Sequence, residues 1–263
     1  SNSYGEETPV FFENRQINQF SNCFIGIENI AVLCYNYNCK RFMFPQTAQS
    51  ILLTHGGPFM KQLSIMLKPA SSLCNMRCKY CFYADVSNLR SIPSFGLMQP
   101  SAAHALISNI FADLEAGDHL TLAFQGGEPT LAGLDFFCNF VEEVNQYQNK
   151  SILVQYALQT NGLLLDDTWC RFLKKNQFLV GLSLDGPAPY HNANRVDADR
   201  KGTFQQVMAA KQRLDRHNVE YNVLMTLTSQ LARHPQQVWS FMEEQGLRYV
   251  QVTPCMGSLV GPN

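Results

Sequence analysis

The sequence predicts an α/β fold of six parallel strands connected by helices. Short apolar runs alternate with amphipathic helical patterns from about residue 62 onward, which is typical of right-handed βαβ units. Polar, glycine-bearing turns follow three of these runs, at the strand ends where parallel α/β folds bind ligands. Periodicity alone leaves open whether the six strands form an open sheet or an incomplete barrel.

The first half of the repeat has clear boundaries. An apolar run at 63–68 ends before Pro69 and predicts the first strand. Pro100 lies in the first turn of the next helical pattern, where its missing N–H costs little. We therefore expect a helix, a strand, a helix and a strand in turn, at 100–115, 120–124, 135–147 and 152–158.

The second half continues the alternation. The pattern at 166–176 has acidic residues early and two lysines late, the charge order that the helix dipole favours. Gly246 is a typical residue after the end of a helix. We expect helices at 166–176, 203–218 and 235–246, and strands at 178–184, 220–227 and 249–253.

Composition restricts the function classes. The chain has 263 residues, of which 46% are hydrophobic, and a formal net charge of −1. A chain without excess positive charge is a poor match for nucleic acid or an acidic membrane surface. No apolar run approaches the roughly 18 residues that a membrane span needs. We expect a globular, cytoplasmic protein with neither nucleic acid nor membrane as its partner.

Residues 1–59 differ from the rest of the chain. They are rich in Asn, Phe and Tyr and show no sustained period. Met60 directly precedes the first predicted strand, so we interpret 1–59 as an atypical N-terminal extension, a candidate for a non-native or disordered segment. Residues 60–263 form the predicted α/β domain.

Three of the nine cysteines are clustered, with the spacing C-x₃-C-x₂-C, at Cys74, Cys78 and Cys81. Fully liganded [4Fe–4S] clusters use four cysteines. Three ligands leave one iron open, and an open position is typical of a catalytic metal centre. A structural zinc site and three buried thiols without metal are the alternatives. Cys138 and Cys170 are predicted to be core residues.

The motifs around these cysteines resemble those of the radical S-adenosylmethionine superfamily. The resemblance is carried by Lys68–Tyr83 around the cysteines, and by Ala123–Gly133, Leu158–Gly162 and Ser183–Arg195. Together these segments are similar to anaerobic sulfatase-maturing enzymes of the SPASM type, from about Met60 to Cys255. The resemblance implies an incomplete (β/α)₆ TIM-like barrel with one [4Fe–4S] cluster, whose fourth iron binds S-adenosylmethionine.

The resemblance also implies site residues. Gly126, Gly127 and Glu128 would hold the amino end of the cofactor, while Ser183 and Arg195 would contact it elsewhere. Each of these residues also has a structural alternative. The glycines and Glu128 could simply form a turn, Ser183 could be a hydrogen-bonded serine of a strand, and Arg195 could be a solvated charge in a loop.

Two further positions match cofactor contacts of the family. Tyr80 would lie near the adenine, and Met256 matches a position whose backbone meets the adenine. His191 and Asn192, between Asp185 and Arg195, are candidates for contact with a peptide substrate.

Members of this family use a 5′-deoxyadenosyl radical to oxidise a cysteine or serine side chain of a sulfatase to formylglycine. The expected partners are a sulfatase polypeptide or similar peptide and a reduced electron donor of the ferredoxin or flavodoxin type. The auxiliary clusters and the catalytic base of the family would lie beyond Asn263. We therefore interpret the chain as a truncated piece whose full turnover is doubtful. The alternatives are another radical enzyme that modifies peptides, and a non-catalytic iron–sulfur or zinc module.

Overall fold

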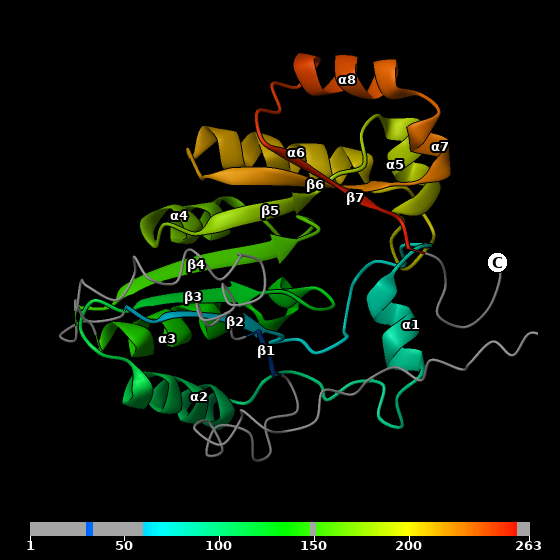
Figure 1. Ribbon diagram of the computed structural model, residues 1–263. Helices are drawn as coiled ribbons and strands as arrows, with labels where there is room; N and C mark the ends of the chain where they lie inside the picture. The colour runs from blue at the N-terminus through cyan, green and yellow to red at the C-terminus, as the bar shows by residue number, and fades with distance from the viewer. Residues whose placement is uncertain (1–29, 34–59, 148–150, 257–263) are drawn as a thin grey trace, which may run out of the picture.

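The computed structural model describes the backbone of residues 30–33 and the whole of residues 60–147 and 151–256. Its centre is a seven-stranded sheet in sequence order, β1 to β7, with the six strands β2 to β7 all parallel. These six strands are Gln62–Leu67, His119–Phe124, Leu153–Thr160, Leu179–Ser183, Tyr221–Leu227 and Val250–Pro254. The curved sheet does not close on itself, so the fold is a partial (β/α)₆ barrel, as predicted (Figure 1).

Helices cover the outer face of the sheet. The long connections are α2 (Pro100–Asp113), α3 (Leu134–Asn145), α4 (Asp167–Lys175), α6 (Phe204–Arg216) and α8 (Pro235–Glu244). Each lies within two residues of its expected bounds at both ends, which is the usual uncertainty of a helix end. Among the described residues, no helix is long and apolar enough to cross a lipid bilayer.

Several short elements have no counterpart in the sequence patterns. They are α1 (Phe82–Asn88), the 3₁₀ turn η3 (Pro129–Ala132), α5 (Ala188–Asn194) and α7 (Ser229–Ala232). Helices α1, α5 and α7 lie at the side where the parallel strands end (Figure 1). These elements are too short for a hydrophobic period to reveal them.

The segment 1–59 contributes one described element. Strand β1 (Ile30–Leu33) pairs with β2 in antiparallel register, with Ile30 opposite Leu67. The rest of the segment lies outside the described residues, so its interpretation as an atypical extension stays a prediction.

The core lies between the sheet and the outer helices. Alternate residues of β3 (Leu120, Leu122 and Phe124) are at most 1% exposed, because they point toward the helices. Phe124 contacts Phe137 of α3, with ring centroids 4.8 Å apart. Cys170 is buried as predicted.

Two sequence expectations need correction. Cys138 is only partly buried, because the buried face of α3 is occupied by Phe137, Phe140, Val141 and Val144. Strand β4 continues to Thr160 rather than ending at Leu158, because Gln159 and Thr160 pair with Gly181 and Leu182 of β5.

Candidate functional site

The cysteine loop, residues 74–81, follows β2 and is fixed by a segment more than a hundred residues away. The amide of Arg77 donates to the carbonyl of Val196 at 2.7 Å, and that of Lys79 donates to Asn194 at 3.0 Å. Arg195 lies between these two acceptors. The pairing therefore brings Arg195 beside the cysteine loop.

The three thiols of this loop are free and partly exposed. Sγ of Cys74 accepts from the amide of Met76 at 3.4 Å and from Nδ2 of Asn161 at 3.9 Å. Burial raises the pKa of Cys78 to about 11, although Arg195 opposes this shift. Burial also raises the pKa of Cys74. Because metals bind the thiolate, ligation at this site would release protons.

The three thiols are the candidate metal ligands of this loop. Among the residues that the structure describes, no group of three His, Cys, Asp or Glu side chains converges closely enough to hold one ion. Donation from Met76 and Asn161 to Cys74 resembles the hydrogen bonds that tune cluster sulfurs.

The glycine pair after β3 packs directly on the segment that precedes Cys74. The amide of Gly127 donates to Ser71 at 3.0 Å, and the amide of Glu128 donates to Leu73 at 2.7 Å. A Cβ on Gly127 would lie 2.1 Å from the carbonyl oxygen of Leu73. Only glycine fits this approach of two backbones.

Glu128 is 1% exposed and joins the ends of β3 and β4. Its Oε1 accepts from the amide of Thr130 at 3.1 Å and from the hydroxyls of Thr130 and Thr160 at 2.6 and 2.7 Å. Its Oε2 accepts from the amide of Asn161 at 2.8 Å. Burial raises the pKa of Glu128, and the donated hydrogen bonds partly offset the rise. Oε2 keeps more free accepting capacity than Oε1.

Asp185, which follows β5, contacts Tyr80, Arg195 and Thr226. Its Oδ2 accepts from the hydroxyl of Tyr80 and lies 3.0 Å from Nε of Arg195, while its Oδ1 accepts from the amide of Thr226 at 2.9 Å. The contact with Arg195 is an ion pair rather than a well-aligned hydrogen bond. The guanidinium of Arg195 also lies 5.5 Å from the centre of the Tyr80 ring.

Burial in this group changes the pKa of both Arg195 and Tyr80. Burial disfavours the charge of Arg195, but Asp185, Tyr80 and Cys78 outweigh it and raise the pKa of this residue. Burial also raises the pKa of Tyr80. Within the described part of the chain, neither Nη atom of Arg195 has a hydrogen-bond partner. The two Nη groups of Arg195 can therefore donate hydrogen bonds to a carboxylate.

His191 lies behind this group, fully buried. Its Nδ1 accepts from the amide of Asp185 at 3.2 Å, so Nε2 carries the hydrogen and faces the hydroxyl of Thr203 at 3.1 Å. That hydroxyl in turn donates to the carbonyl of Arg195 at 3.1 Å. Burial lowers the pKa of His191 to about 4.

The suggestion that His191 and Asn192 contact a peptide substrate is therefore wrong for His191, because its ring has no exposed surface. Asn192 has a structural contact as well, since its Oδ1 accepts from the amide of Phe204 at 2.9 Å.

The remaining predicted residues lie at the same end of the sheet. Ser183 ends β5, and its hydroxyl accepts from Nε2 of Gln159 at 3.0 Å. Met256 follows β7 and is 61% exposed. Its contact with a cofactor stays a prediction.

The sequence assigned no role to Asp185, and it predicted Asn161 only as a polar group supporting the site, without its partners. Asp185 joins Tyr80 to Arg195, and Asn161 contacts both Glu128 and Cys74. Their position directly after strand ends was the available signal, but it could not show which side chains they meet.

A scan against protein families matches the model of the radical SAM superfamily to residues 69–235, more than half of the chain. A cysteine-type anaerobic sulfatase-maturating enzyme of Clostridium novyi is 43% identical over 77% of this chain and 54% of that protein. A serine-type enzyme of Bacteroides thetaiotaomicron is 30% identical over 77% of this chain and 49% of that protein. The chain thus spans about half the length of these relatives.

Solved structures are similar as well. A structure described as native anSMEcpe with bound AdoMet and Kp18Cys peptide has a TM-score of 0.69 and 39% identity. The match covers 74% of this chain and 52% of that one.

Proposed function

This chain belongs to the radical SAM superfamily, and from that premise we propose that it forms the radical-generating part of an anaerobic sulfatase-maturating enzyme. Cys74, Cys78 and Cys81 would bind three irons of a [4Fe–4S] cluster, leaving the fourth for S-adenosylmethionine. The observation that supports the proposal is the pairing of the cysteine loop with residues 194–196, which brings Arg195 beside the three cysteines.

The cofactor, when bound to a reduced cluster, supplies the radical chemistry, while the protein orients it and excludes side reactions. Gly126 and Gly127 would allow close approach of the backbone, and Oε2 of Glu128 would accept from an ammonium group. Arg195 would bind a carboxylate through its Nη atoms, held in place by Asp185 through Nε. Ser183, Tyr80 and Met256 would complete the contacts.

The proposed overall reaction is oxidation of a cysteine or serine side chain of a sulfatase to formylglycine. The relatives named above are sulfatase-maturating enzymes, and one similar structure holds a peptide. A partial barrel also suits a peptide substrate, because its open side can admit a polypeptide segment. A reduced ferredoxin or flavodoxin would be the electron donor, and the compartment would be the cytoplasm.

The 263 residues correspond to about half the length of those relatives, and the proposal for these residues by themselves is limited to cluster and cofactor chemistry. The 263 residues should bind cluster and cofactor and cleave the cofactor slowly when reduced, without efficient formation of formylglycine. Robust formylglycine formation would contradict this expectation.

Anaerobic reconstitution with iron and sulfide, followed by electron paramagnetic resonance of the reduced protein, tests the proposal. Adding S-adenosylmethionine should change the signal of the reduced cluster, and cleavage products should appear. Cys78→Ala is expected to abolish both, while Cys138→Ala, a matched change on α3 away from the loop, should leave both unchanged. A cluster signal insensitive to the cofactor would instead indicate a non-catalytic iron–sulfur module.

A further inference from the structure

A second candidate site lies beside the cysteine loop, between the segment that leaves β2 and helix α1. It is a small, partly open pocket of about 20 Å³. The residues that define its chemistry are Lys68, Ser71, Ser72, Tyr83, Ser87 and Arg90. None of the groups described above as cofactor contacts lines it.

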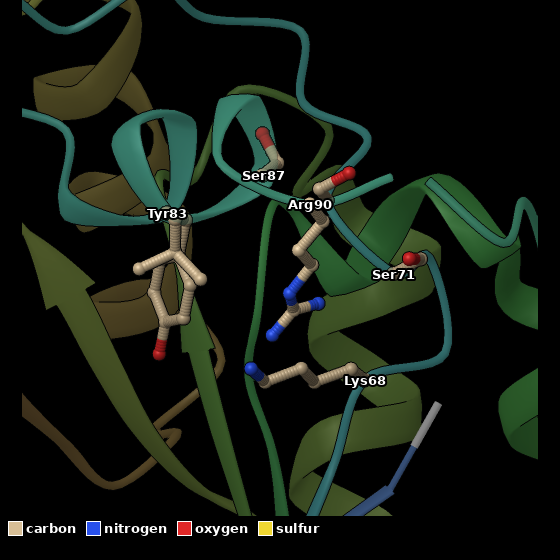
Figure 2. Close-up of a pocket in the computed structure, with 7 residues that line it drawn as sticks. Lys68, Ser71, Tyr83, Ser87 and Arg90 are labelled. Atoms are coloured by element: carbon tan, nitrogen blue, oxygen red, sulfur yellow. The ribbon is translucent and has the colours of Figure 1, made fainter. Parts of the chain in front are cut away.

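The pocket holds two positive charges. Figure 2 shows the ammonium group of Lys68 and the guanidinium of Arg90 pointing toward one another beside the ring of Tyr83. Burial, together with the charge of Arg90, lowers the pKa of Lys68. No acidic residue lines the pocket, and no ion pair among the described residues includes Lys68 or Arg90. Two like charges held together without a counter-ion favour an anion between them.

The hydroxyl groups of the pocket are mostly occupied by the backbone. Ser72 donates to the carbonyl of Pro93 at 2.6 Å, and Ser87 donates to that of Ala84 at 3.0 Å. Oγ of Ser71 accepts from the amide of Phe95 at 3.1 Å. The contacts left for a ligand are therefore chiefly the two cations.

Tyr83 supplies an apolar wall next to these cations. The ammonium of Lys68 lies 4.9 Å from the centre of its ring, in cation–π contact. A ligand with a charged end and a short apolar stem could meet both kinds of surface. An acidic side chain has this composition.

We propose that this pocket binds a carboxylate group with a short apolar stem, held between Arg90 and Lys68 and packed against Tyr83. A planar guanidinium matches a carboxylate with two parallel hydrogen bonds, and an ammonium adds a compact charge. The carboxylate belongs either to an acidic side chain of a polypeptide that approaches the cysteine loop or to a small organic acid. The inference does not depend on the proposed enzymatic function.

Binding can be followed at Lys68 itself. Reductive ¹³C-methylation of the lysines in the 263-residue chain keeps their charge and gives each an NMR signal. The signal of Lys68 is identified by its loss in Lys68→Arg. The chain is then titrated with acetate, with a blocked peptide that contains one Glu, and with the same peptide carrying Gln instead.

The Lys68 signal should shift saturably with the Glu peptide and not with the Gln peptide. Arg90→Gln should weaken binding about tenfold or more, since it removes a charge-assisted contact. Arg248→Gln, which removes an exposed arginine elsewhere, should leave the affinity unchanged. An unshifted Lys68 signal, an equal response to the Gln peptide, or full affinity in Arg90→Gln would overturn the proposal.

The two sources of carboxylate give different results. If acetate binds as tightly as the Glu peptide, the site takes small organic acids. If the peptide binds at least about tenfold more tightly, a difference of about 1.4 kcal/mol, the site recognises a polypeptide. Either result supports a carboxylate site, and neither requires cluster or cofactor.

Discussion

Replacing Gly127 with alanine tests whether the glycine pair shapes the cysteine loop. The added Cβ would lie 2.1 Å from the carbonyl oxygen of Leu73, the residue before Cys74, whereas ordinary contacts begin at 3.4 Å. The difference, 3.4 − 2.1 = 1.3 Å, is the shift that one of the two backbones must make. That shift also disturbs the 2.7 Å hydrogen bond from the amide of Glu128 to the same carbonyl.

The energetic cost has two parts. Overpacking in a closely packed region costs about 1–3 kcal/mol. A disrupted hydrogen bond adds about 1 kcal/mol. We expect Gly127→Ala to lower the free energy of unfolding by about 2–4 kcal/mol and to reduce the iron retained after reconstitution, because Cys74 moves with Leu73.

Urea unfolding and iron content per chain are the measurements. Gly133→Ala is the control, since Gly133 has a positive φ of 85° but no atom within 4 Å of an added Cβ. It should lose about 1–3 kcal/mol from backbone strain, because its φ of 85° and ψ of 154° suit glycine alone, while keeping the iron content of the parent chain. Normal iron content together with unchanged stability in Gly127→Ala would refute the argument that these backbones are in contact.

Two further predictions concern the group around Asp185. Arg195→Lys should lower the affinity for S-adenosylmethionine about tenfold or more, because it replaces a planar fork by a point charge, while iron content stays normal; equilibrium binding under anaerobic conditions measures both. The pKa of His191 is about 4 when folded against an ordinary value of 6.5, so the unfolded chain binds more protons between these values. Stability from this residue is therefore full above about pH 6.5 and is lost as the pH falls toward 4, by about 3 kcal/mol in total. Urea unfolding at several pH values should show this loss, and His191→Gln should remove that part of the slope; an equal slope in both chains would contradict it.

The order and type of the long elements could be predicted because each has a strong local signal. Helix α4 shows this well: its acidic start and lysine-rich end are local features, and the observed helix Asp167–Lys175 lies within the expected range. Helix α5 has no such signal, because its seven residues begin beside a proline and follow no hydrophobic period. It is held instead by Tyr190, which packs with Met225 and Leu231.

Only those parts of the candidate site that lie within a single stretch of sequence could be predicted. The cysteine spacing indicated a cluster loop from the sequence alone, and the glycine pair after a strand indicated a close backbone approach. The partner of each buried polar group was not predictable. Glu128 shows this: it accepts four hydrogen bonds from Thr130, Thr160 and Asn161, and no local pattern identified these donors, while its predicted contact with a cofactor amino group stays a prediction.

The sequence by itself determined the alternation of strands and helices and the three clustered thiols, because both depend on the spacing of neighbouring residues. The tertiary structure alone decided that Arg195 lies beside Cys78, that Asp185 joins Arg195 to Tyr80, and that Lys68 faces Arg90. These pairs are formed where separate loops meet at the ends of parallel strands. Their geometry depends on the curvature of the whole sheet and on the packing of its connecting segments. No local sequence pattern encodes either property.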